Sequence, residues 1–125
     1  MATEKKGKEE LEVFTKAKKL CDYTFQITCK APKAYRWNII DKILNNTLEL
    51  IEILYQANDL SDKERKVKQR YADTKIKILG YLHGLANNIH VFDNKQTEHL
   101  GLLLLETRQG LFKWIKGEEK GLNSS

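Results

Sequence analysis

The chain has 125 residues, enough for one domain with a single hydrophobic core. Hydrophobic residues make up 41% of the chain, the net charge is +5, and there is one proline and no glycine-rich stretch. This composition excludes a disordered chain, and the shortage of turn residues argues against a β-sandwich.

No apolar stretch approaches the roughly 20 residues that a membrane span needs, since the longest run covers residues 102–105. The charged residues 1–10 lack the apolar region of a signal peptide. Cys21 and Cys29, if on one helix, lie about 12 Å apart, too far for a disulfide. We expect both to be small buried residues of a cytoplasmic protein that has no membrane contact.

Apolar residues recur with the helical period in the first half of the chain. They predict a first helix over residues 8–30, which Pro32 ends because proline clashes with a continuing helix. A second helix is predicted over residues 33–58. The predicted core rows are Phe14, Ala17, Cys21, Phe25 and Thr28 on the first helix, and Trp37, Ile40, Leu44, Thr47, Ile51, Leu54 and Tyr55 on the second.

Two further helices are predicted in the second half. Ser61 and Glu64 have capping-box spacing, which predicts a third helix over residues 62–89. Asp93 or Asn94 is the expected cap of a fourth helix over residues 95–116, after which the tail 117–125 is expected to fray. The predicted core rows are Val67, Tyr71, Ile78, Leu82, Leu85 and Ile89, then Leu100, Leu103, Leu104, Thr107, Leu111, Trp114 and Ile115.

Long amphipathic helices joined by short loops predict one domain of the all-α class, an antiparallel up-down four-helix bundle. The helices also carry a second apolar side, at Leu102, Leu105 and Phe112 on the fourth helix and at Ile39, Leu50, Ile53 and Ala57 on the second. A helix that is apolar on two sides is usually buried on both, which predicts a homo-oligomer. Scattered partial exposure is the alternative.

The sequence contains no catalytic or metal-binding motif. His83 and His90 lie about 10 Å apart along one helix, too far to share a zinc ion. There is no phosphate-binding glycine loop and no nucleophile elbow, and the acids of the second helix lack the Glu-x-x-His motif of di-iron bundles. We therefore expect a protein that is not an enzyme and needs no cofactor or metal; His99 is interpreted, like the other two, as an ordinary helical histidine.

Positive charge is concentrated in residues 62–77, where seven bases face three acids, a local net charge of +4. Helical spacing places four of the bases on one outward ridge interrupted by Asp73, and such a ridge can neutralise phosphates. A solvated helix face is the alternative. The four bases of the ridge are Lys63, Lys66, Arg70 and Lys77.

Three details qualify this ridge. Lys68 and Lys75 fall on the predicted core side, so they either reach the bundle edge or mark a bend. No aromatic residue is expected among the four bases, which predicts contact with a nucleic-acid backbone without base stacking. Gly80 and Gly84 continue the ridge, and they either admit a close backbone or are simply tolerated.

Three stretches resemble the accessory variability determinant (Avd) family of diversity-generating retroelements, over residues 12–116. They are Ala31-Pro32-Lys33 with Arg36; Arg70-Tyr71-Ala72-Asp73; and Asn94-Lys95-Gln96-Thr97-Glu98 followed by Glu106, Leu111, Trp114 and Ile115. The resemblance implies a homopentameric bundle that partners a reverse transcriptase during mutagenic copying, with a basic surface toward RNA or DNA. A related branch, encoded in ribosomal RNA intervening sequences, carries an Asn-Ile-Ala-Glu-Gly motif where this chain has residues 46–50.

The chain also departs from the family. Relatives tend to carry arginines where Gly80 and Gly84 stand, and a Gly-Arg pair and a further glycine where Arg108, Gln109 and Phe112 stand. Two hypotheses follow. In one, the protein binds a reverse transcriptase and nucleic acid through Lys63, Lys66 and Arg70 with Lys77, and oligomerises through Gly80, Gly84, Leu102, Leu105 and Phe112. In the other, it is a structural oligomeric scaffold with no nucleic-acid role.

Overall fold

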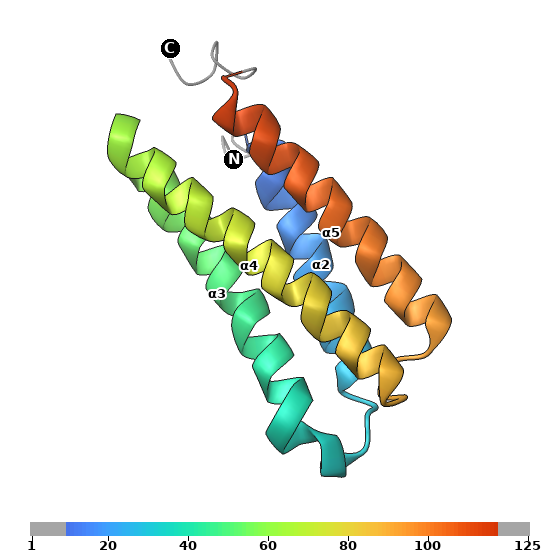
Figure 1. The fold of residues 1–125 in the computed structure, drawn as a ribbon. Helices are drawn as coiled ribbons and strands as arrows, with labels where there is room; N and C mark the ends of the chain where they lie inside the picture. Colours follow the sequence, from blue (N-terminus) through green and yellow to red (C-terminus); the bar gives the residue numbers. More distant parts are fainter. Residues whose placement is uncertain (1–9, 118–125) are drawn as a thin grey trace, which may run out of the picture.

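The computed structural model describes residues 10–117, except for the side chains of residues 35–37. Four α-helices fill most of this part of the chain (Figure 1), and it contains no β-strand. Their bounds are α2 Glu12–Thr28, α3 Asp41–Asp59, α4 Asp62–Asn88 and α5 Asn94–Ile115. Residues 8–9, the start of the predicted first helix, and residues 118–125 of the predicted tail lie outside the described residues.

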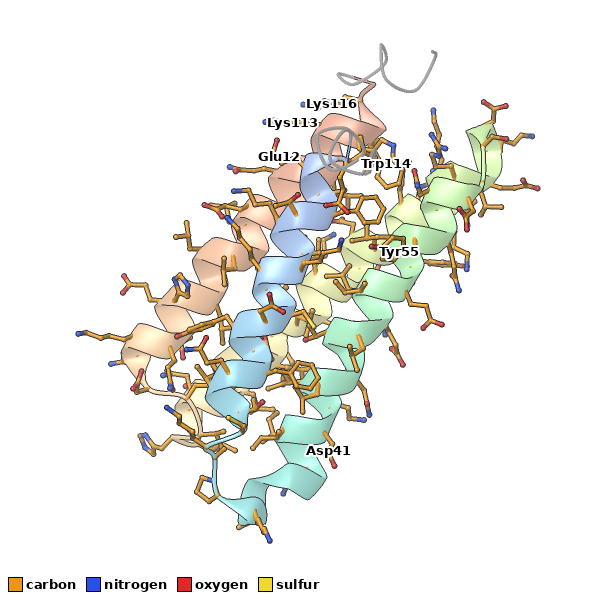
Figure 2. The ribbon with its side chains drawn as sticks, turned by 180° about the vertical axis from the view of Figure 1, so that it is seen from behind. Glu12, Asp41, Tyr55, Lys113, Trp114 and Lys116 are labelled. Carbon is orange, nitrogen blue, oxygen red and sulfur yellow. The ribbon has the colours of Figure 1, made fainter. Side chains whose placement is uncertain are left out.

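The four helices form a ring in which each contacts the helices before and after it in the chain, and α2 contacts α5. Consecutive helices run in opposite directions, so α2 begins and α5 ends at the same end of the bundle (Figure 1). Figure 2 shows Glu12, Lys113 and Trp114 together at that end and Asp41 at the other. The predicted antiparallel four-helix bundle is confirmed.

The connection around Pro32 differs from the prediction of one helix over residues 33–58. A short 3₁₀ turn, Lys33–Tyr35, is followed by a π-helical turn, Arg36–Ile40, before α3 begins at Asp41. A π-helical turn fits one more residue than an α-helical turn. Its last two residues, Ile39 and Ile40, are both buried in the core.

The predicted start of α4 is confirmed at Asp62, but its predicted capping box does not form, because the side chain of Ser61 makes no capping hydrogen bond. The start of α5 has a complete box. The Asp93 carboxylate accepts a hydrogen bond from the Gln96 backbone N–H at 2.7 Å, and the Gln96 side chain accepts one from the Asp93 N–H at 2.9 Å. Two donors that a helix start leaves without partners are thereby satisfied.

Much of the core rows predicted for the first, second and fourth helices is buried, as expected. On α5 the whole predicted row is buried except for half-buried Ile115. On α2 and α3 the rows hold less well: Phe25 and Tyr55 are exposed. Leu50, Ala57 and Ile39, predicted on a second apolar side, lie in the core instead, and Ile53 is half-buried against it. Cys29 is exposed and Cys21 half-buried, so the prediction of two buried cysteines is wrong.

The predicted core row of the third helix is wrong. Of its members only Leu82 is buried, and the others are exposed. The helix turns another face inward, whose buried residues are Gln69, Ala72, Ile76, Leu79, His83 and Ala86. Both rows have helical spacing, and the outer row has the larger apolar side chains. Hydrophobicity alone therefore favoured the wrong face.

None of the helices within residues 10–117 is long and apolar enough to cross a membrane.

Candidate partner-binding surface

All four bases of the predicted ridge lie on the solvent-exposed side of α4. Lys77 pairs with Asp73 one turn earlier, at 3.5 Å between Nζ and Oδ2. The side chains of Lys63, Lys66 and Arg70 form no ion pair within residues 10–117. These three cations are thus available to an acidic partner.

The other bases of this segment have structural contacts. The guanidinium of Arg65 donates to the carbonyl oxygens of Ala57 and Asn58, at 3.1 and 3.2 Å, and lies 5.4 Å from the centre of the Trp114 ring. It thereby adds a donor to the Ala57 carbonyl, which also accepts from the Leu60 N–H, and supplies one to the Asn58 carbonyl at the end of α3. Part of the local charge excess therefore stabilises the corner between α3 and α4.

Lys68 and Lys75 lie on the side of α4 that faces α3. The Lys75 ammonium donates to Asn46 Oδ1 at 2.8 Å and to Glu49 Oε1 at 2.6 Å, while Lys68 lies 5.7 Å from the centre of the Tyr71 ring. Lys75 therefore lies at the bundle edge, one of the two alternatives left open by the sequence: its side chain extends across the boundary with α3 to reach polar partners.

Asp73, the acid that interrupts the basic ridge, is part of the contact between α4 and α5. Arg108 donates from Nε to Asp73 Oδ1 at 2.7 Å, and its guanidinium also lies 4.7 Å from the centre of the Phe112 ring. Burial raises the pKa of the Asp73 carboxyl, but Arg108 and Lys77 outweigh this and lower its pKa below the ordinary value. Asp73 is therefore ionised at neutral pH and offsets one charge of the ridge.

An apolar row runs beside the ridge along the outer face of α4. Its members are separated alternately by four and three residues, and all are exposed. We call this row the α4 seam: Val67, Tyr71, Thr74, Ile78, Tyr81 and Leu85. Tyr81, at 71%, is the most exposed large hydrophobic residue among the described residues. The sequence predicted no aromatic residue among the four bases themselves; Tyr71 and Tyr81 lie beside them, in the α4 seam.

The residues predicted for an oligomer interface have different surroundings. Leu102 and Leu105 are about half exposed on the outer side of α5, while Phe112 is half-buried beside Arg108. A Cβ at Gly80 would lie 3.8 Å from Leu104 Cδ1 of the same chain, and one at Gly84 would meet nothing within 4 Å. The structure brings the two glycines onto α4 and the other three residues onto α5.

One glycine with a clear packing role was not identified from the sequence. A Cβ at Gly110 of α5 would lie 2.9 Å from the backbone N and Cα of Val13 on α2. Gly110 therefore allows the backbones of these two helices to approach closely. The signal that points to it is spatial, because nothing in the local sequence marks the crossing point.

The three histidines have different surroundings. His83 is buried with both ring nitrogens unpaired among the described residues, and burial lowers its pKa to about 4. The His99 ring packs edge-on against Tyr23 at 4.4 Å, and His90 is exposed. No group of three or more metal-ligating side chains occurs within residues 10–117. The hollows found there are shallow, for example the groove lined by Lys19, Tyr23, His99 and Leu102.

The fold is that of a helical-bundle protein, and its helix α4 exposes the four ridge bases beside the apolar α4 seam. A family model described as bAvd-like matches residues 12–117, so the chain belongs to this Avd-type family of accessory proteins. The resemblance noted from the sequence is thereby confirmed. No curated protein matches the chain.

Proposed function

We propose that the protein is the accessory protein of a diversity-generating retroelement and binds its reverse transcriptase and nucleic acid through the basic ridge of α4. The family supports the accessory role. The observation that carries the binding proposal is the set of three exposed cations, Lys63, Lys66 and Arg70, that no described acid pairs with. Charges of this kind supply the salt-dependent attraction to phosphates.

The oligomeric state forms a second part of the proposal. The outward leucines 102 and 105 of α5 are the residues that we expect between subunits of a homopentamer, together with Gly84 and, at the edge of the contact, Gly80 and Phe112. Leu102 and Leu105 are 49% and 52% exposed, and neighbouring apolar side chains of this size are usually covered in an interface. A ring needs such a surface to meet a different surface of the next subunit.

The test is binding to labelled RNA, DNA and RNA–DNA hybrid across a salt series. The parent is compared with a variant in which Lys63, Lys66, Arg70 and Lys77 are all alanine. A matched variant loses four exposed lysines elsewhere, namely Lys19, Lys30, Lys42 and Lys95. We expect the ridge variant to weaken binding and flatten the salt dependence, and the matched variant to have the smaller effect.

Co-purification with the reverse transcriptase of the same element tests the protein partner. Equal loss of nucleic-acid binding in both lysine variants would mean that only total charge matters, and the ridge would lose its role. A parent that binds neither nucleic acid nor the polymerase at low salt would favour the alternative, a structural scaffold. The exposed leucines of α5 are the observation that favours that alternative.

A further inference from the structure

We propose that the α4 seam is a docking site for an acidic amphipathic helix of another protein. The alternation of four and three residues from Val67 to Leu85 is the spacing with which one helix packs along another in a coiled coil. Bundle packing leaves this row open: Val67, Tyr71 and Tyr81 are 46%, 55% and 71% exposed. A second helix laid along the row would cover these side chains.

The charges beside the seam indicate the chemistry of that helix. In a coiled coil, the positions flanking the apolar row determine which partner is accepted. Here Lys63, Arg70 and Lys77 flank the seam on one side, and Lys68 and Lys75 flank it on the other. Every charged residue of α4 at these flanking positions is basic between residues 63 and 77; Lys75 also pairs with Glu49 of α3 and Lys77 with Asp73, which leaves Lys63, Lys68 and Arg70 as the bases without a described ion pair. A partner with glutamate or aspartate at its own flanking positions is therefore complementary.

Two other occupants fit less well. Two copies of the seam facing each other would bring the flanking bases together, which is unfavourable. A seam that meets a different surface of a second copy is a separate outcome of the test below. A nucleic-acid backbone would use the bases but would leave Val67, Ile78 and Leu85 with no apolar contact. A protein helix uses both the exposed apolar row and the charges.

This inference deepens the proposed function, and rests on it only in assigning the helix to the polymerase partner. It also assigns different roles to different bases on this face of α4. Lys66 lies outside the flanking positions, on the α5 side of the seam, and stays available to phosphates while the seam is occupied. Asp73 lies on the same side and is paired with Arg108 of α5 and with Lys77.

The test uses two synthetic heptad peptides with isoleucine and leucine in the apolar positions. One carries glutamate at every flanking position and the other carries lysine, so neither pairs readily with itself. We expect the full chain to bind the glutamate peptide and not the lysine peptide, as measured by fluorescence anisotropy. The change Ile78→Ser with Tyr81→Ser should weaken this binding at least about tenfold. The control Phe25→Ser with Leu48→Ser, at exposed apolar residues of α2 and α3, should not, and circular dichroism checks that both variants fold.

A charge-reversed variant, with Lys63→Glu, Arg70→Glu and Lys77→Glu, should prefer the lysine peptide. If the full chain bound the two peptides equally, or bound neither of them, the inference would be overturned. So would an oligomer that dissociates when Ile78 and Tyr81 change and binds no peptide, because the seam would then join copies of this chain. So would loss of nucleic-acid binding in the seam variant without any peptide binding, which would make the tyrosines a stacking surface.

The outcomes separate the two proposals. A parent that binds nucleic acid through the ridge but neither peptide keeps the proposed function and loses the docking site. A parent that binds the glutamate peptide but neither the polymerase nor nucleic acid keeps the docking site and loses the proposed function.

Discussion

Asp73 of α4 accepts a hydrogen bond from Arg108 of α5, with 2.7 Å between Oδ1 and Nε. This contact joins two neighbouring helices and lies beside the basic ridge. The side chains are 18% and 40% exposed, so solvent screens the pair, and we expect it to contribute little to stability. Its larger effect is on charge, because the carboxylate offsets a positive charge next to Lys77.

The change Asp73→Asn tests this interpretation. It keeps the side-chain shape, removes the negative charge and releases Arg108 and Lys77. We expect tighter binding to nucleic acid, with a salt slope steeper by about one, and a small decrease in melting temperature. The control Asp22→Asn removes an exposed acid on α2. Weaker binding by Asp73→Asn than by the control would mean that the ridge depends on the geometry that Asp73 maintains.

The crossing of α2 and α5 at Gly110 yields a stability prediction. An alanine Cβ at this position would lie 2.9 Å from the Val13 backbone, which cannot move without shifting the helix. Overpacking costs about 1–3 kcal/mol, against a gain of about 1 kcal/mol in helix propensity. Gly110→Ala should therefore lower the free energy of unfolding by up to about 2 kcal/mol in urea titrations. Gly101→Ala on the same helix, where a Cβ meets nothing within 4 Å, should leave stability unchanged or raise it.

The sequence predicted the four helices, the break at Pro32 and the start of α4 because these features depend on local signals: periodicity, proline geometry and loop position. It did not predict which face of α4 is buried. Ala72 and Ala86 are small, and Gln69 and His83 are polar, so the core row has a weaker apolar signal than the exposed seam. The choice between the rows depends on where α3 and α5 lie, which is tertiary information.

The basic segment was only partly predictable for the same reason. Exposure of the four ridge bases followed from helical spacing. The roles of Arg65 and Lys75 did not, because their partners Ala57, Asn46 and Glu49 belong to another helix. Gly110 likewise acts across a helix pair. Contacts between elements were thus the part of this surface that the sequence could not supply.

The buried His83 should make the stability of the bundle depend on pH. Its pKa falls from an ordinary value near 6.5 to about 4, because burial disfavours the charged ring. The unfolded chain therefore binds more protons between these values, and stability rises with pH across that range. The free energy of unfolding should have its full value above about pH 6.5. It should fall by an amount of order 3 kcal/mol as the pH drops toward 4.

Urea unfolding between pH 4 and pH 7 measures this loss. The change His83→Leu removes the titrating group and should flatten the dependence, whereas His90→Gln, at an exposed histidine, should leave it intact. Unchanged pH dependence in His83→Leu would assign the effect to the carboxylates. Asp73 belongs to these: its lowered pKa gives stability that is present above its ordinary pKa and lost at more acidic pH.

The outer leucines of α5 test the oligomer. Leu102→Ser with Leu105→Ser replaces two half-exposed apolar side chains that make no part of the core row, so the monomer should keep its helical content. If these leucines lie between subunits, the assembly should dissociate, because losing two covered leucines removes several kcal/mol per contact. Sedimentation velocity measures the mass.

Phe25→Ser with Leu48→Ser, at 41% and 48% exposure on α2 and α3, is the matched control. An unchanged mass in the leucine variant together with dissociation of the control would move the interface to α2 and α3. A parent that is monomeric at all concentrations would remove the oligomer, and with it the scaffold alternative, leaving α4 as the surface through which this chain acts.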